Sequence, residues 1–258
     1  MPTCPDSLVD YVARSAVREN VLDALASDPA TTRTLCASLA DSESGIYAAV
    51  GELSDADLVE RNGDDAWATT CLGDLVASTL ARRRGIESLV DADAAYWRDH
   101  DATALPAPFC ASLDVLADDA EVVRATDTDP GRVTRMLFDH MADAARFDGI
   151  SPVYAPEFID PMESAVENAD RPPRVLVRDA VFEDVDDLAT MESLSQFELR
   201  SADVTIGLTV TEDAALLSLP TADGRYDEST QLVATSAAAR SWGRDLFEWY
   251  WRRGDPAP

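Results

Sequence analysis

Residues 17–70 contain the pattern that most restricts the fold of this chain. Apolar residues recur at helical spacing within 17–26, and the Asp-Pro pair at 28–29 ends that stretch. Thr31 is a suitable N-cap for a short second helix, and after a turn a third helix is expected over 43–53. Three short helices in close succession are predicted.

A β-hairpin is expected directly after the third helix. Apolar stretches at 58–59 and 66–68 flank Asn62-Gly63, and Asn-Gly between such stretches is a strong hairpin signal. Helix, helix, turn, helix and hairpin, in this order, are the plan of a winged helix-turn-helix, which places one helix in the major groove of DNA. We therefore predict a winged helix-turn-helix domain over 1–70, with double-stranded DNA as its partner.

The predicted recognition helix and wing supply the candidate DNA-binding residues. Hydroxyl and amide groups form hydrogen bonds with bases and phosphates, and an arginine neutralises a phosphate. Five acidic residues and no arginine lie between Asp41 and Leu58, however, and this charge opposes association with DNA in dilute buffer. The candidates are Ser42, Ser44, Tyr47, Arg61 and Asn62.

A basic cluster follows the predicted wing at Arg82-Arg83-Arg84. Three arginines can contact a phosphate backbone. The alternative is a solvated helix face on which they pair with nearby acids. The sequence favours the second interpretation, because acidic residues greatly outnumber basic ones throughout the chain.

The charge balance points to a saline environment. The formal net charge is −28, and the chain contains 21 arginines and no lysine. Molar salt reduces the Debye length to about 3 Å, which screens a self-repulsion that would destabilise the fold in dilute buffer. A halophilic protein is therefore expected. With no signal peptide and no apolar segment long enough to span a membrane, we expect it in the cytoplasm.

The four cysteines are isolated, since no Cys-x-x-Cys motif occurs. Buried free thiols are the simplest interpretation, and neither a metal site nor a cofactor is predicted. The chain also has no Gly-x-Ser-x-Gly, Walker or Rossmann motif, so an enzymatic function is not expected. The cysteines are Cys4, Cys36, Cys71 and Cys110.

Two further regions follow the predicted winged helix. Residues 71–108 are expected to form helices that link the domains or pair two protomers, with a boundary near 100–108, where periodicity is lost. Residues 109–258 alternate between strand and helix patterns and then continue with strands alone. This order predicts an α/β domain whose sheet is parallel at first and mixed at one edge, so the whole chain combines α+β and α/β parts.

The expected elements of this last region are as follows. Strands are predicted at 122–126, 149–154, 174–178, 196–200, 204–210, 214–219 and 232–234, and helices at 132–146, 156–168, 182–191 and 237–253.

A ligand site is expected where these strands end and helices begin, as in other α/β sheets. Arginines pointing into such a crevice would bind a small anionic effector. The alternative is that they form surface salt bridges. The candidate ligand-binding residues are Arg124, Thr126, Asp127, Tyr154 and Arg178.

Several phrases carry a resemblance to a known family. They are YWRDHD at 96–101, VVRATDTDP at 122–130, LLSLPTADGRYD at 216–227 and WGRDLFEWY at 242–250. With them, the chain resembles haloarchaeal winged-helix transcriptional regulators with a FilR1-type C-terminal domain. The resemblance implies a transcription factor whose second domain has phospholipase-D-like topology and senses a ligand or dimerises. The phospholipase motif itself requires a lysine, which this chain lacks.

The chain also departs from that family. Related regulators open the recognition helix with an arginine-containing phrase, whereas Ser42-Glu43-Ser44-Gly45 stands here. Asp74 occupies a position after the wing where a basic residue is common. We therefore expect a homodimeric DNA-binding regulator. The alternative is a protein-interaction module whose acidic winged helix no longer binds DNA.

Overall fold

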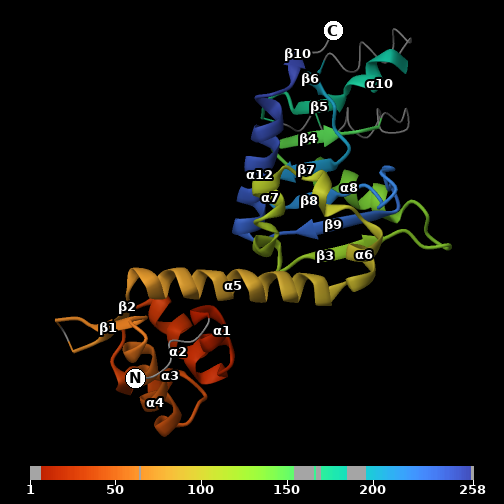
Figure 1. Ribbon diagram of the computed structural model, residues 1–258. Helices are drawn as coiled ribbons and strands as arrows, with labels where there is room; N and C mark the ends of the chain where they lie inside the picture. Colours follow the sequence, from red (N-terminus) through yellow and green to blue (C-terminus); the bar gives the residue numbers. More distant parts are fainter. Residues whose placement is uncertain (1–6, 64, 154–165, 167–169, 185–195, 257–258) are drawn as a thin grey trace. The chain divides into compact units, whose positions relative to one another are not determined.

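The computed structural model describes residues 7–63, 65–153, 166, 170–184 and 196–256 (Figure 1). The chain divides into two compact units, Met1–Arg84 and Gly85–Pro258. Each is described by itself. Within the described part of the chain, no helix combines the length and the apolar composition that crossing a bilayer requires.

The first unit consists of short helices followed by a hairpin and the start of a long helix. Serine or threonine caps the first four helices, each accepting a hydrogen bond from a backbone N–H in the first turn. The predicted helices and hairpin are all present. The elements are α1 (Leu8–Ala13), α2 (Ala16–Ser27), α3 (Thr32–Ser38), α4 (Glu43–Asp55), β1 (Val59–Arg61), β2 (Trp67–Thr69) and α5 (Cys71–Ala92).

The core of the first unit is formed by the inward faces of these helices. Leu22, Leu35, Ile46 and Leu53 are almost completely buried in one cluster. Gly73 makes this packing possible at the start of α5, because a Cβ atom there would lie 2.0 Å from the backbone oxygen of Leu58. A residue that weakens a helix by propensity is thus required here by the close approach of the β1 strand.

The hairpin has a different turn from the two-residue Asn-Gly turn that its sequence favours. The strands pair antiparallel, with Arg61 opposite Trp67. The backbone N–H of Asn62 donates to the Ala66 oxygen, and Asp65 adopts φ 60°. The left-handed residue is therefore Asp65, as in a three-residue loop, and not Gly63.

The second unit contains an eight-stranded mixed sheet with helices and 3-10 turns around it. Its helices are α6 (Ala94–Asp99), α7 (Ala107–Cys110), α8 (Arg132–Ala142), α10 (Asp179–Asp184) and α12 (Ala237–Trp251), with 3-10 turns η1 (Ala102–Ala104) and η2 (Leu113–Leu116). Its strands are β3 (Glu121–Arg124), β4 (Phe147–Ser151), β5 (Arg174–Arg178), β6 (Glu198–Ala202), β7 (Gly207–Thr211), β8 (Ala215–Ser218), β9 (Thr230–Ala234) and β10 (Asp255–Pro256).

The strand order is β10-β6-β5-β4-β7-β8-β9-β3. Strand pairs β4–β5 and β5–β6 are parallel, and all other neighbours are antiparallel. The mixed sheet and the β7–β8 pair are confirmed. The expectation that the sheet begins with adjacent parallel strands is wrong for β3, because three antiparallel strands separate it from β4. These three strands, β7, β8 and β9, come later in the sequence and lie between β4 and β3 in the sheet.

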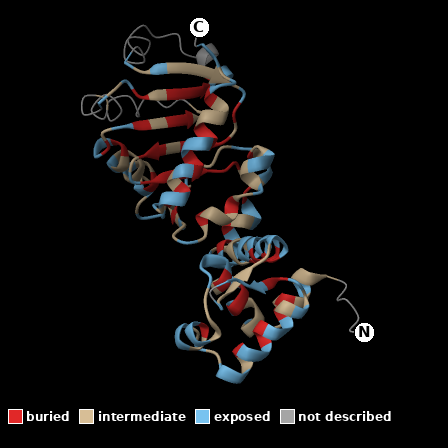
Figure 2. Ribbon diagram, turned by 90° about the vertical axis from the view of Figure 1, so that its left-hand side faces the viewer, coloured by how far each residue is buried: buried red, intermediate tan, exposed pale blue. Residues whose placement is uncertain are grey.

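The two faces of the sheet carry different layers (Figures 1 and 2). On one face, α12 packs over buried residues such as Leu208, Val210 and Leu217, in the main core cluster. On the other face, α8 packs against β3 and β7. α8 ends at Ala142, before the predicted Arg146, because the chain turns there and the Ala145 N–H donates to the Glu212 carboxylate.

The predicted linker is not a separate region. His100 and Leu105, which we placed at a boundary, are 8% and 3% exposed and lie within the second unit, and Tyr96 belongs to its core. The division falls instead between Arg84 and Gly85, inside α5. Periodicity is lost over 100–108 because this segment packs as short turns, not because it is exposed. The helix predicted at 156–168 and most of the one at 182–191 lie outside the described residues.

Candidate nucleic-acid interface

Helix α4 has a buried face and an exposed face whose middle is uncharged and is bordered by the exposed acids Glu43, Glu52 and Asp55. Ile46, Val50 and Leu53 are buried, which fixes the orientation of the helix. The outward face presents Ser44, Tyr47, Ala48 and Gly51, at successive spacings of three, one and three residues. The Tyr47 side chain is unusually prominent for an apolar surface residue, at 61% exposed. In a chain with 27% charged residues, this uncharged stripe allows close approach of another surface.

Ion pairing within the unit compensates part of the acidity around α4. The Arg18 guanidinium lies 2.9 Å from the Glu52 carboxylate and 4.0 Å from the centre of the Tyr11 ring. Asn20 donates a hydrogen bond of 2.9 Å to Asp41. Two of the five acids that oppose DNA binding are therefore already engaged by residues of α2.

Two of the five predicted DNA-binding residues use their side chains in hydrogen bonds within the first unit. Ser42 is the N-cap of α4 and accepts from the Gly45 N–H at 3.2 Å. Asn62 likewise stabilises the hairpin turn, its side-chain oxygen accepting from the Ala66 N–H. The three others, Ser44, Tyr47 and Arg61, are exposed.

Arg61 lies in the wing but is not a free cation. It forms an ion pair of 2.8 Å with Asp65, and its guanidinium lies 5.2 Å from the centre of the Trp67 ring. Both side chains of the pair are largely exposed, so the pairing is weak and a phosphate can replace the carboxylate. The wing therefore offers one arginine, at the expense of this ion pair.

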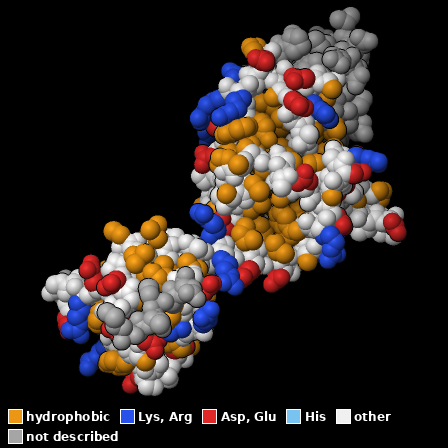
Figure 3. All heavy atoms as spheres, viewed as in Figure 1, with side chains coloured by type: hydrophobic (Ala, Val, Ile, Leu, Met, Phe, Trp, Pro, Cys, Tyr) orange, Lys and Arg blue, Asp and Glu red, His pale blue; other side chains and the backbone are white. Residues whose placement is uncertain are grey.

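One arginine of the cluster on α5 pairs with nearby acids, which was the second of the two interpretations offered for this cluster. Arg84 pairs with Glu19 at 2.8 Å and with Asp23 at 2.7 Å. Partial burial opposes its charge, but the hydrogen bonds with Asp23 and Glu19 outweigh this and raise the pKa of Arg84. On the face of the first unit seen in Figure 3, acidic and basic side chains are interspersed and form no single basic patch.

The candidate anion-binding residues of the second unit do not form one site. Arg124 pairs with Asp93, and Arg178 lies 3.9 Å from Asp203. Their strands, β3 and β5, are separated by four others, which is about 24 Å at ordinary strand spacing. Thr126 and Asp127 lie in an exposed turn after β3. Tyr154 lies outside the described residues. The surface salt-bridge alternative therefore describes both arginines.

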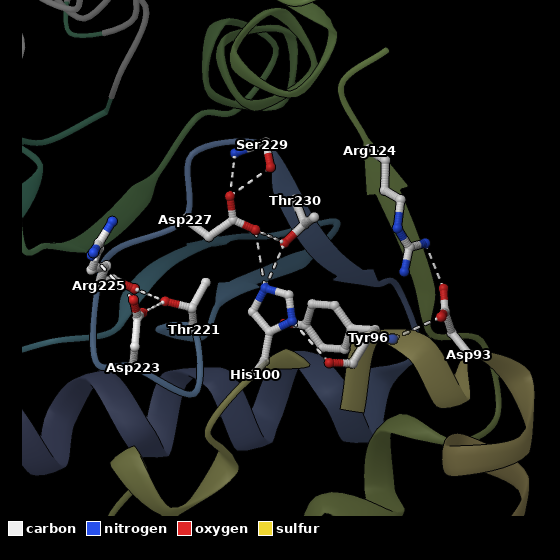
Figure 4. A network of polar contacts seen from close by, with 10 residues as sticks. All are labelled: Asp93, Tyr96, His100, Arg124, Thr221, Asp223, Arg225, Asp227, Ser229 and Thr230. Carbon is white, nitrogen blue, oxygen red and sulfur yellow. Dashed lines mark hydrogen bonds and ion pairs between the residues drawn. The ribbon is translucent and has the colours of Figure 1, made fainter. Parts of the chain in front are cut away.

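Sequence reasoning missed a polar cluster around His100 (Figure 4). The ring is stacked on Tyr96 at a centroid distance of 4.1 Å. One ring nitrogen faces the Tyr96 carbonyl at 2.9 Å, and the other faces Asp227 at 3.0 Å and Thr230 at 3.1 Å. Asp227 also accepts from Ser229. The cluster anchors the loop before β9 to helix α6, and its partners are too distant in sequence for any local pattern to reveal.

Among the described residues, no group of three or more histidine, cysteine or acidic side chains is arranged to hold a metal ion. Cys36, Cys71 and Cys110 are free thiols, as predicted, although Cys71 is exposed and not buried. Cys4 lies outside the described residues.

Two family models match the chain. Residues 130–253 match the model described as methanogenesis regulatory protein FilR1, middle domain, and residues 6–89 match the HVO_A0261 N-terminal domain. A curated relative, methanogenesis regulatory protein FilR1 of Methanothrix harundinacea (strain 6Ac), is 24% identical over 255 residues. The match covers 95% of this chain and 57% of that protein, so the chain spans a little over half the length of its relative.

Solved structures show weaker similarity. TrmBL2, described as an archaeal chromatin protein with a novel mode of DNA binding, matches 98% of this chain and all of that chain, at 12% identity and a TM-score of 0.43. The phospholipase D family member Nuc from Salmonella typhimurium matches 54% of this chain and 97% of that chain, at 9% identity and a TM-score of 0.40. Both TM-scores are below 0.5, so neither similarity bears on function. The chain is therefore similar in sequence to a FilR1 protein over most of its length, and its residues 130–253 match the FilR1 middle-domain model.

Proposed function

We propose that this protein is a DNA-binding transcriptional regulator whose first unit is a winged helix-turn-helix. In this proposal α4 is the recognition helix, and the β1–β2 hairpin is the wing. The second unit senses an effector or contributes to dimerisation, and no catalytic role is assigned to it. The protein acts in the cytoplasm on double-stranded DNA.

One observation carries the proposal, namely the two exposed hydroxyl groups, Ser44 and Tyr47, in the uncharged middle of the outward face of α4. Ser44 and Tyr47 lie on the same side of the helix, and neither is used in the packing of the unit. Hydroxyl groups at these positions can reach base edges or phosphates in a major groove. The sequence similarity to a methanogenesis regulatory protein supports the same class of function.

The acidic composition fits this proposal if the protein works at high salt. Screening weakens the repulsion between the net charge of −28 and the DNA. It also removes most of the counterion-release free energy. Binding then depends on hydrogen bonds and shape, for which the uncharged middle of the outward face of α4 is suited. We propose a halophilic protein for this reason.

Dimerisation through α5 is the second part of the proposal. Leu72 and Leu75 are 41% and 68% exposed at the start of this helix. They share one side with Thr79, at the spacing of a helix–helix seam. A second copy of the chain would cover these leucines and pair two recognition helices for two half-sites.

A protein-interaction module remains the alternative function. The pairing of Arg61 with Asp65 and the seven arginines against fourteen acids within residues 1–84 favour it. On this alternative Tyr47 would contact a partner protein and not DNA.

Fluorescence anisotropy with DNA from upstream of the protein's own gene tests the proposal, in roughly 2–3 M KCl, where screening is near its limit. Tyr47→Ala and Ser44→Ala should each weaken binding to this DNA about tenfold or more, with little change on a scrambled duplex. Ser78→Ala, at an exposed position on α5, is the matched control and should bind normally. Equal binding of both duplexes, or no binding by the folded protein, would favour the interaction module.

A further inference from the structure

A small cavity lies in the second unit between α8 and one face of the sheet. Its volume is about 80 Å³, and it is open on one side. Leu137, Phe138 and Met141 of α8 cover it. Gly149 and Gly207 lie on the sheet beneath, and at Gly149 an added Cβ atom would have no neighbour closer than 3.6 Å.

Buried polar groups line the sheet side of the cavity. Gln231 and Ser218 are 4% and 3% exposed, on the neighbouring strands β9 and β8. Among the described residues, the side-chain amide of Gln231 has no hydrogen-bond partner. A buried amide without partners is costly, and such groups in native proteins are normally satisfied. Neither amide atom is among the fully buried, unpartnered side-chain atoms of the described residues, so the Gln231 amide reaches the open cavity and can pair with a group that enters it.

The described residues that line the cavity are all uncharged. These fourteen residues are apolar, glycine or neutral polar, in a chain with 27% charged residues. An ionised group placed there would lose its hydration without gaining a counter-charge. The cavity thus discriminates against anions and cations alike. This contrasts with the anionic effector that the arginine positions led us to expect.

We propose that this cavity binds a neutral, ring-sized molecule that carries a donor and an acceptor side by side, as an amide does. The Gln231 amide provides the complementary acceptor and donor, and Phe138 and Phe147 provide apolar contacts for the ring. The proposal names a ligand class for the sensing role given above. Only the statement that this ligand acts as an effector depends on the proposed regulatory function.

The size of the cavity limits the ligand. A cavity of roughly 150 Å³ in another protein binds benzene. The cavity here is smaller but open, so a single ring can enter with one edge toward solvent. Larger ligands, which typically need pockets of about 300 Å³ or more, do not fit without movement of α8.

Three isosteric probes test the charge preference: benzamide, benzoate and benzamidinium. Binding is measured on the full-length protein in molar KCl, without DNA, by saturation-transfer NMR and by the shift in unfolding temperature. We expect saturable binding of benzamide. Benzoate and benzamidinium should bind at least tenfold more weakly.

Two variants locate the binding. Gly149→Val fills the cavity, and since a Cβ atom there lies 3.6 Å from its nearest neighbour, the strand should fold normally. Gln231→Leu removes the amide at similar volume. Each should reduce benzamide binding at least tenfold. Gln196→Leu, the same change at an exposed position, should leave it unaltered.

The proposal is overturned if no probe binds saturably, if a charged probe binds as well as benzamide, or if both cavity variants bind normally. Because DNA is absent from the assay, its outcome is separate from that of the DNA-binding test. A protein that binds benzamide at this site but no DNA would retain the cavity proposal and lose the regulator proposal.

Discussion

The Nε2 atom of His100 lies 3.0 Å from the Oδ2 atom of Asp227, although 127 residues separate them in the chain. The Nδ1 atom lies 2.9 Å from the Tyr96 carbonyl oxygen, so the ring is held at both nitrogens. Burial opposes ionisation of Asp227, but hydrogen bonds from Ser229, Thr230 and His100 outweigh it and lower its pKa.

Asp227→Asn should destabilise the second unit by about 1–3 kcal/mol, because it replaces one carboxylate oxygen, which accepts either from Ser229 or from Thr230 and His100, by an amide NH2 that cannot accept. Chemical denaturation in molar KCl, followed by tryptophan fluorescence, measures this, since four of the five tryptophans lie in this unit. Asp223→Asn, the same change at an exposed carboxylate, is the control. If both variants lose the same free energy, the hydrogen bonds that Asp227 accepts have no special role.

Asp148 makes the stability of the second unit depend on pH. Its carboxylate is 13% exposed and lies 2.8 Å from both Arg171 and Arg174. Burial opposes ionisation, but hydrogen bonds from Arg174 and Arg171 outweigh it and lower its pKa. Because the pKa of Asp148 is lower in the folded than in the unfolded protein, its carboxylate stabilises the fold at pH values above the unfolded-state pKa, near 3.8. This stabilisation is lost as the pH falls through the folded-state pKa.

We therefore expect Asp148→Asn to cost about 3 kcal/mol at pH 7 and progressively less below about pH 4. Unfolding free energies of both proteins across this range provide the measurement. An equal difference at pH 7 and pH 3 would contradict the assignment. Asp213→Asn, at an exposed carboxylate, is the control and should show a small difference throughout.

Leu75→Glu should convert a dimer into a monomer. The side chain is 68% exposed in the single chain, so the change should leave the first unit folded. At a helix–helix seam the buried carboxylate would weaken association about 100-fold or more. Light scattering should show the mass fall from twice 27.9 kDa to that value. Ala81→Glu, exposed on another side of α5, should remain dimeric, and dimerisation of both variants would place the seam elsewhere.

Salt should stabilise the protein through its charge. Raising KCl from about 0.2 to about 3 M screens the repulsion of a net −28, and we expect the unfolding temperature to rise by roughly 10 °C or more. Sucrose at equal osmolality is the control, because it favours compact states by exclusion alone. An equal rise with sucrose would contradict the charge explanation.

The first unit could be predicted from sequence because its signals are local. Thr31 and Ser42 cap the helices that they precede, and the buried stripe of α4 is visible as Ile46, Val50 and Leu53. The hairpin was predicted from Asn62-Gly63, and only its turn type differs. Caps, stripes and turns each depend on a few consecutive residues, so neighbouring structure changes them little.

The ligand site could not be predicted, because it depends on strand order. Arg124 and Arg178 were grouped on the assumption that successive strands lie side by side, yet β3 is at the far edge of the sheet. The signal for the cavity is present as Gln231 and Ser218, polar residues within apolar strands. Without the strand register, nothing in the sequence shows that they share a face.

The position of β3 also has a consequence for how the chain acquires its structure. Its partner β9 follows more than a hundred residues later, with Glu121 opposite Val233. During synthesis, β3 therefore waits as an unpaired edge until nearly the whole second unit has left the ribosome, and loop closure over that length is slow. Ribosome stalling or a premature stop before residue 230 would leave that edge open to association with other chains. A strand made near the end of synthesis, β9, is thus the one that protects the first strand of this sheet.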